Sequence, residues 1–200
     1  MTPEEYYGNA FSLLKQGETY LKTLIENYPN SCVKDGLQAI IYIKTRIKKP
    51  ESMMEKLRKR GLMEDSCTAL QTTHDALGIR VVCSFVEEVY RIARWLEKRE
   101  DIQIIEKKDY IAYPKPNGYR SLHLIIRFTV KDLKDMSAEI QLRTIAIDFW
   151  ATLEHQMKYK RNVQHEETIR RELKRCADEI ASVDLSMQTI RDILQNNKWE

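Results

Sequence analysis

The sequence predicts an α+β fold in which about five β-strands form a sheet flanked by helices, with a long helix at each end of the chain. Several short segments alternate apolar and polar residues, which is the period of a strand. A helical pattern at residues 86–99 separates two of these segments, as in a βαβ-like unit. Apolar residues near the C-terminus recur at intervals of four and three, the heptad pattern of a packed helix.

Composition indicates one folded domain, with no membrane partner. The 200 residues are 42% hydrophobic and 32% charged, and the net charge is +3, which is typical of a globular protein. No apolar run reaches the roughly 18 residues of a membrane span, and the N-terminus lacks the blocks of a signal peptide. Cys32, Cys67, Cys83 and Cys176 are far apart, so we expect reduced cytoplasmic thiols rather than a zinc site or disulfides.

Residues 2–27 are predicted to form the N-terminal helix. Thr2 and Glu5 have the spacing of a capping box, Pro3 suits the first helical position, and Pro29 follows the end. Residues 1–36 are therefore interpreted as an N-terminal helical region.

Residues 37–48 alternate as a strand, and one of its faces is cationic. The two faces are Ile41, Ile43, Thr45 and Ile47 on one side and Tyr42, Lys44, Arg46 and Lys48 on the other. Neighbouring cations repel one another unless an anionic ligand compensates them. The alternative is an edge strand that its lysines protect from aggregation. The arginine between two lysines favours the ligand-binding interpretation.

A short helix is predicted at residues 50–60, before Gly61. Its N-terminus offers free N–H groups and a partial positive charge, which suit a phosphate. Ser52 lies in the first turn, and Lys56 and Lys59 follow near the same side. Basic residues on a helix are usually only solvated, but the cationic strand just before this helix favours an anion site.

The remaining strands bring polar groups together. Residues 75–85 form a buried strand with Asp75 at its mouth, residues 102–106 a short strand, and residues 119–130 and 137–143 a hairpin. The polar face of the hairpin carries Tyr119, Ser121, His123, Glu139, Gln141 and Arg143. The loop before it carries Lys108, Lys115 and Asn117. A ring, a hydroxyl and an imidazole in one row can stack a base and bind phosphate. A solvated hairpin explains this stretch about equally well.

Two helices complete the chain. Residues 144–161 are predicted to bury Phe149, Trp150 and Leu153, with Glu154 and His155 on the flank. The heptad stripe of the tail comprises Ile169, Leu173, Cys176, Ile180, Val183, Met187, Ile190 and Leu194. Such a stripe must be covered, and we expect the N-terminal helix and another subunit to cover it together, which predicts an oligomer.

Asp75 and Glu139 are the candidate metal ligands. Two carboxylates that hold Mg²⁺ beside cations that bind phosphates are the parts needed for nucleotidyl or pyrophosphoryl transfer. His74 and Asp75 form the dipeptide of HD hydrolases, but the other histidines are scattered. The sequence has no Walker-type loop, no dinucleotide-binding glycine motif and no signature of a serine or cysteine nucleophile.

The segments HDALGIRVVCSF, KDYIAYPKPNGYRSLH and AEIQLRTIAIDFWATLEHQMKYK, preceded by YIKTRIKKPESMMEKLRKRG, closely resemble the synthetase domain of the RelA/SpoT family. The resemblance covers residues 37–161 and extends to small alarmone synthetases of the RelQ type. It implies a nucleotidyltransferase-like mixed sheet in a single domain over residues 1–200. Residues 37–161 would be the catalytic core and residues 162–200 a C-terminal oligomerisation helix, in a homotetramer.

The implied activity is transfer of the β,γ-pyrophosphate of ATP to the 3′-hydroxyl of GTP or GDP, giving pppGpp or ppGpp and AMP. Asp75 would bind Mg²⁺, with Glu139 as second ligand or as base. The implied ATP contacts are Arg46 and Arg80 on adenine and Lys48, Ser52, Lys56 and Lys59 on phosphates. The implied GTP contacts are Tyr119 on guanine, Asn117 on its edge, Lys108, Lys115 and His123 on phosphates, with Glu154 and His155 in support.

Three points stay open at this stage. Many long members carry an arginine where this chain has Glu106, which leaves the choice among GTP, GDP and GMP undecided. A related enzyme acting on tRNA or adenine nucleotides, or an RNA- or alarmone-binding regulator with vestigial catalysis, are the alternatives. Some members bind single-stranded RNA or an allosteric alarmone, and the sequence decides neither.

Overall fold

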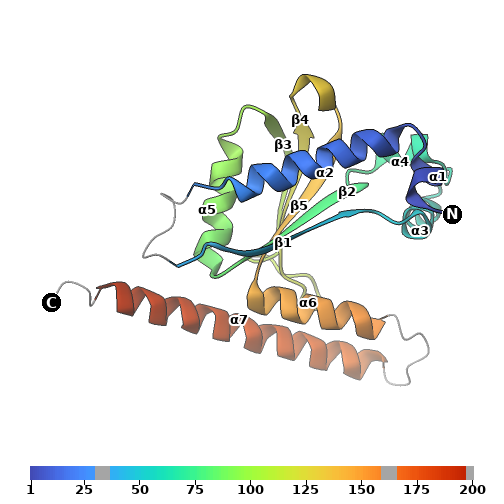
Figure 1. The fold of residues 1–200 in the computed structure, drawn as a ribbon. Coiled ribbons are helices and arrows are strands. Elements are labelled where there is room, and N and C mark those ends of the chain that lie inside the picture. The colour runs from blue at the N-terminus through green and yellow to red at the C-terminus, as the bar shows by residue number, and fades with distance from the viewer. Residues whose placement is uncertain (30–36, 159–165, 197–200) are drawn as a thin grey trace.

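Five strands form one mixed sheet in the order β1-β2-β5-β4-β3 (Figure 1). A computed structural model describes residues 1–29, 37–158 and 166–196. The strands are β1 (Ile40–Ile47), β2 (Leu77–Cys83), β3 (Ile102–Asp109), β4 (Leu122–Phe128) and β5 (Ser137–Thr144). β2 and β5 pair in parallel, and the other neighbouring strands are antiparallel. The predicted α+β class with a mixed sheet is confirmed.

The N-terminal region contains two helices, α1 (Pro3–Tyr7) and α2 (Ala10–Glu26). The prediction of one helix over residues 2–27 is therefore wrong. Gly8 has a φ of 52°, a left-handed value that only glycine adopts readily, and it turns the chain between the two helices. The capping box of Thr2 and Glu5 at the start of α1 is confirmed.

Helices α2 and α5 (Val86–Glu97) contribute to one core cluster with the strands. Leu21 of α2 and Ile92 of α5 are fully buried beside Val81 of β2. Helix α5 connects β2 to β3, but β5 and β4 lie between these two strands, so the predicted strand–helix–strand unit is not a directly paired one. Helices α3 (Pro50–Lys59) and α4 (Ser66–Thr72) precede β2, and the sequence analysis did not identify α4.

Strand β1 shows the predicted alternation only over its second half. Ile43, Thr45 and Ile47 are half-buried, whereas Lys44 and Arg46 are exposed. Ile41 was expected on the buried side, but it is exposed because the register shifts between Ile40 and Tyr42, the residues on either side of it.

The predicted hairpin is present, with β4 and β5 antiparallel and joined through a 3₁₀ turn, η2 (Lys131–Leu133). The expectation that the first strand begins at residue 119 is wrong, since β4 begins at Leu122. Tyr119 nevertheless lies near His123, because their side chains are joined by a hydrogen bond of 2.8 Å.

Helices α6 (Ile145–Lys158) and α7 (Glu166–Asn196) lie side by side below the sheet in Figure 1. Trp150 is buried against Ala177 of α7 as part of a small second cluster. The expected burial of Phe149 and Leu153 is wrong, since these side chains are 59% and 40% exposed. The predicted helix end at residue 161 lies outside the described residues.

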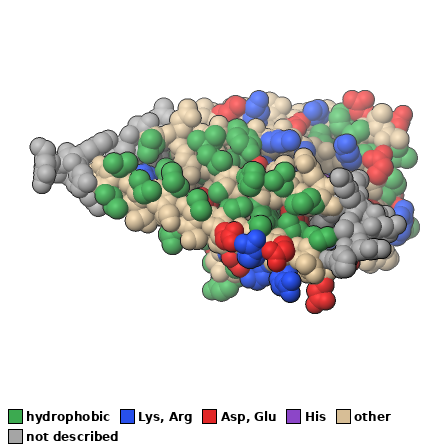
Figure 2. Space-filling view, turned by 90° about the horizontal axis from the view of Figure 1, so that it is seen from below, with side chains coloured by type: hydrophobic (Ala, Val, Ile, Leu, Met, Phe, Trp, Pro, Cys, Tyr) green, Lys and Arg blue, Asp and Glu red, His purple; other side chains and the backbone are tan. Residues whose placement is uncertain are grey.

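The heptad stripe of α7 is covered along only part of its length. Ile169, Leu173, Cys176 and Ile180 are half-buried, whereas the exposed members are Val183, Met187, Ile190 and Leu194. The N-terminal helix does not provide the cover that we expected, because α7 packs on α6 and α5 while α2 lies across the sheet from it (Figure 1). Figure 2 shows hydrophobic side chains gathered on the face that α6 and α7 form. Among the described residues, no helix combines the length and apolarity that crossing a bilayer requires.

Candidate active site

Asp75 lies two residues before β2 and binds two lysines from different elements. Its Oδ2 accepts a hydrogen bond from Lys48 Nζ at 2.7 Å, and its Oδ1 accepts one from Lys56 Nζ at 2.6 Å. The three side chains are between 15% and 26% exposed. The carboxylate and its two cations therefore form one partly buried cluster, the Asp75 triad.

Burial alone would raise the pKa of Asp75, but Lys48 and Lys56 outweigh this effect and lower it to about 2. Burial also lowers the pKa of Lys56, against the opposing influence of Asp75. The cluster is thus an ionised carboxylate that neutralises closely spaced ammonium groups in the absence of an external anion.

Contacts of α1 and α3 hold Lys48 and Lys56 in place. Met53 and Leu57 of α3 are fully buried, which turns Lys56 toward Asp75. The Tyr7 hydroxyl of α1 donates to the backbone carbonyl of Lys48 at 3.0 Å.

Two other residues predicted on this helix are not brought to Asp75. Lys59 binds Glu55 at 2.7 Å with its side chain 73% exposed, and Ser52 is exposed in the first turn of α3.

Arg46 and Arg80 line one small cavity of about 200 Å³. Gly78 of β2 pairs with Arg46 across the sheet, and the absence of a side chain there leaves room beside the guanidinium group. Lys44 and Gln141 complete the polar wall. Two arginines that line one cavity suit an aromatic base, because guanidinium groups stack on π systems.

Glu139 begins the parallel pairing of β5 with β2, opposite Gly78. Its Oε1 contacts His123 Nδ1 at 3.0 Å, and its Oε2 accepts from Gln141 at 2.7 Å. Burial would raise the pKa of Glu139, but the hydrogen bonds from His123 and Gln141 lower it overall, while the charge of Asp75 opposes them. Asp75 and Glu139 thus lie toward the N-terminal ends of the paired strands β2 and β5, and the charge of Asp75 acts on Glu139. We call this end of the two strands the Asp75–Glu139 edge.

The predicted acceptor residues lie around Tyr119. Its hydroxyl contacts His123 Nε2 at 2.8 Å, and Lys115 Nζ lies 5.1 Å from its ring centroid. Lys108 instead binds Glu106 at 2.9 Å, which raises the pKa of Lys108. The ammonium of Lys115 occupies one face of the tyrosine ring in this structure.

The loop that carries Asn117 is held by α6 and α7. Glu154, buried on α6, accepts a hydrogen bond from Asn117 Nδ2 at 3.0 Å. Gly118 has a φ of 88°, and a Cβ atom there would lie 2.6 Å from Ala177 Cβ and 3.1 Å from the backbone of Lys174. His155 is exposed beside Glu154. Glu154 therefore positions Asn117, and α7 fixes the turn that follows.

Arg143 and Asp148 are buried polar residues to which the sequence analysis gave no role. They are 4% and 5% exposed and bind one another at 2.9 Å. The alternation of β5 placed Arg143 on the correct polar face. For Asp148 the only signal was a lone acid within the apolar run IAIDFW, which does not distinguish a buried carboxylate from an exposed one.

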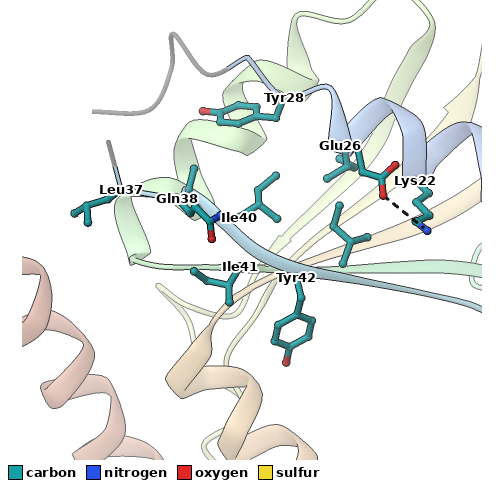
Figure 3. Close-up of a pocket in the computed structure, with 11 residues that line it drawn as sticks. Lys22, Glu26, Tyr28, Leu37, Gln38, Ile40, Ile41 and Tyr42 are labelled. Atoms are coloured by element: carbon teal, nitrogen blue, oxygen red, sulfur yellow. Dashed lines mark ion pairs between the residues drawn. The ribbon is translucent and has the colours of Figure 1, made fainter. Parts of the chain in front are cut away.

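A larger cavity, of about 660 Å³, lies elsewhere, between the end of α2 and the start of β1 (Figure 3). Glu26 is the one carboxylate in the part of its lining that the structure describes, and it pairs with Lys22 at 3.8 Å. Tyr42, which also lies on β1, points toward α6 (Figure 3). Among the described residues, the lining of this cavity holds no second acid and no cation other than Lys22, which makes the Asp75–Glu139 edge the candidate site.

The two carboxylates at the Asp75–Glu139 edge fit a cation whose remaining ligands are waters and substrate phosphates. Within residues 1–29, 37–158 and 166–196 no group of three or more His, Cys, Asp or Glu side chains could hold a metal. Asp75 and Glu139 are both kept ionised by their neighbours. Magnesium is commonly held by one or two carboxylates, with waters and substrate phosphates completing its octahedron.

Residues 45–164 match a family described as a region found in RelA/SpoT proteins. The chain is 41% identical to GTP pyrophosphokinase YwaC of Bacillus subtilis over 159 residues, covering 78% of this chain and 76% of that protein. It is 32% identical to GTP pyrophosphokinase YjbM of the same organism over 192 residues, covering 94% and 87%.

Solved structures from Bacillus subtilis are similar over nearly the whole chain. Small alarmone synthetase 2 has a TM-score of 0.80 at 36% identity, covering 92% of this chain and 97% of that one. Small alarmone synthetase 1 bound to its product pppGpp has a TM-score of 0.79 at 30% identity, covering 90% and 93%.

Proposed function

This chain belongs to the RelA/SpoT family, and from that premise we propose that it is an alarmone synthetase that transfers the β,γ-pyrophosphate of ATP to the 3′-oxygen of GTP or GDP. The observation that supports the proposal is the Asp75–Glu139 edge, where Gly78, three residues after Asp75, pairs with Glu139 and the charge of Asp75 acts on that carboxylate. The arginine-lined cavity and the Tyr119 ring adjoin that edge through Gln141 and His123. We therefore infer a place for one purine on each side of this edge.

On the donor side, adenine would lie between Arg46 and Arg80, in the cavity that they line. The ATP phosphates would meet Lys48 and Lys56 and compete with Asp75 for both ammonium groups. As the lysines turn to the phosphates, the Asp75 carboxylate becomes available to a cation. ATP and its cation are therefore expected to bind together rather than separately.

Members of this enzyme class use a divalent cation, and we propose Mg²⁺ held by Asp75 and Glu139. The cation would offset negative charge that shifts among the phosphate oxygens during transfer. Hydrogen bonds from His123 and Gln141 keep Glu139 ionised, with a lowered pKa. This environment suits a metal ligand better than a base, because a base near neutral pH needs a raised pKa.

On the acceptor side, guanine would stack on Tyr119 and displace the Lys115 ammonium from its ring. Lys115 is then free to meet a phosphate, whereas His123 would have to give up one of its contacts with Tyr119 and Glu139 to do so. Asn117, oriented by Glu154, would read the guanine edge. Glu106 neutralises Lys108 in this structure, so we expect Lys108 to add little discrimination among GTP, GDP and GMP.

The proposed core at residues 37–161 contains every candidate residue from Arg46 to His155, and its end lies outside the described residues. The exposed stripe of α7 and the face of α6 beside it support a homo-oligomer, which we propose to be a tetramer in the cytoplasm. Large exposed apolar patches usually mark interaction surfaces. Single-stranded RNA and a regulatory alarmone are further proposed partners, testable by filter binding.

The decisive experiment offers competing acceptors to the purified protein. Labelled ATP and Mg²⁺ would be incubated with GTP, GDP, GMP, unlabelled ATP and tRNA, and products separated by thin-layer chromatography. We expect label on the 3′ position of guanosine nucleotides. Labelled tRNA or adenosine products would establish the related pyrophosphokinase instead. RNA or alarmone binding with no transfer would establish a regulator.

A further inference from the structure

Arg143 makes more polar contacts than its neighbours on the hairpin, although it is almost fully buried. Its guanidinium donates to Asp148 Oδ1 at 2.9 Å, to the Tyr119 hydroxyl at 2.7 Å and to Gln141 Oε1 at 3.2 Å. A longer contact of 3.4 Å reaches Ser121 Oγ. Burying an arginine is costly unless its donors are satisfied, so this position needs an explanation.

Hydrogen bonds join four side chains into a row: Arg143, Tyr119, His123 and Glu139. The direction of each of these hydrogen bonds can be assigned from chemistry. Arginine can only donate, so the Tyr119 oxygen accepts from Arg143 and its own proton is left to donate. Ionised Glu139 can only accept, so His123 carries a proton on Nδ1 and donates it to Glu139 at 3.0 Å. In the neutral ring Nε2 is then an acceptor, and it receives the Tyr119 proton at 2.8 Å. The row runs in one direction, from Arg143 to Glu139.

Asp148 connects this row to the other side of the site. Its Oδ1 binds Arg143 at 2.9 Å and Arg80 at 3.1 Å. The Tyr42 hydroxyl donates to its second oxygen. Burial would raise the pKa of Asp148, but the hydroxyl and the two arginines lower it. One buried carboxylate thus fixes both the arginine beside the adenine cavity and the arginine behind the Tyr119 ring.

We propose that Arg143, oriented by Asp148, is a positioning residue that holds the Tyr119 hydroxyl with its proton directed at His123 Nε2, and that this hydrogen bond fixes the imidazole ring against Glu139. This proposal deepens the proposed function and rests on it. Neither Arg143 nor Asp148 needs to touch a nucleotide for the effect. The simpler explanation, that Arg143 only neutralises Asp148, predicts no influence on His123.

Nitrogen NMR of ¹⁵N-histidine-labelled protein without nucleotide tests this hydrogen bond directly. The wild-type protein should show His123 as the Nδ1–H form with a hydrogen-bonded Nε2. Tyr119→Phe, which removes the donor hydroxyl but keeps the ring, should move the Nε2 resonance toward that of an imidazole nitrogen without a hydrogen bond, while Nδ1 stays protonated against Glu139. Arg143→Gln should do the same. An unchanged His123 spectrum in both variants would overturn the proposal, whatever the activity of the protein.

Kinetics with ATP and GTP provide the second readout. Tyr119→Phe should lower kcat about ten-fold, the order expected for one lost hydrogen bond to a charged group, with the KM for GTP little changed because the ring remains. Arg143→Gln should behave alike. The double variant should be no slower than the slower single variant, since both changes interrupt one row. Losses that multiply would refute the shared route.

Arg127→Gln serves as the matched control, since Arg127 is exposed on the same hairpin and belongs to no assigned contact. It should keep the wild-type His123 spectrum and rate. Thermal unfolding of Arg143→Gln would show whether the buried substitution folds, and Tyr119→Phe keeps the test valid if it does not. An inactive wild-type protein with the expected His123 spectrum would contradict the proposed function while leaving the row intact.

Discussion

Replacing Asp75 with asparagine removes the charge at the centre of the Asp75 triad and keeps its shape. The amide oxygen can still accept one hydrogen bond, but Lys48 and Lys56 then face each other without a counter-charge. The expected result is a less stable protein at neutral pH, because partly buried cations that lose their partner repel each other.

The pKa of Asp75 sets the magnitude. It falls from 3.8 to about 2 on folding. At ~1.36 kcal/mol per pKa unit, ionised Asp75 contributes about 2 kcal/mol to the free energy of unfolding. Since the folded pKa is the lower one, this contribution is present above pH 3.8 and is lost as the pH falls through about 2. The variant lacks it throughout, so the two proteins should converge in acid.

Urea denaturation followed by tryptophan fluorescence, from neutral pH down to about pH 2, measures this difference. Glu64→Gln is the matched control, because it removes a carboxylate from the solvent-exposed pair with Arg58, where ion pairs contribute little. A stability gap that stays constant with pH, or an Asp75→Asn variant as stable as wild type at pH 7, would refute the reasoning.

Three further outcomes are expected. Glu139→Gln should lower the transfer rate at least about a hundred-fold while far-UV circular dichroism stays unchanged, because a neutral amide holds a divalent cation poorly; near-normal turnover would remove Glu139 from the metal site. Tyr119→Ala should raise the KM for GTP about ten-fold or more through lost stacking, and an equal rise in the KM for ATP would contradict a guanine-specific role. Ile190→Asp, on the exposed stripe of α7, should reduce the mass measured by light scattering; an unchanged mass would place the subunit contact elsewhere.

Periodicity in the sequence predicted the strands because each strand presents one apolar face to a shared core. Prediction from periodicity failed where the backbone turns or shifts register although the alternation of apolar and polar residues continues in the sequence. Gly8 divides an otherwise continuous helical stripe, and the register shift beside Ile41 turns an apolar side chain outward. Tyr119 continues the alternation of β4 although the chain there is not yet a strand.

The candidate site was predicted in its parts but not in its connections. Spacing alone placed Glu139 and Arg143 on one face, since the period of a strand is short and regular. No local rule predicts that Asp148 from α6 meets Arg80 from β2, because that contact depends on how the helix docks. The ion pairs of the Asp75 triad could not be predicted either, because Lys48 and Lys56 lie 27 and 19 positions before Asp75 in the sequence.

The close contact of Gly118 with α7 couples the conformation of the Asn117 loop to the position of the C-terminal helix. The turn that follows Asn117 has no freedom to move toward the helix, and Arg120 next to it is bound to Asp178 at 2.9 Å. Helix α7 thus holds the loop that carries Asn117 in its conformation. Truncating or re-engineering that helix should therefore alter which nucleotide the enzyme prefers, even where none of its side chains reaches the substrate.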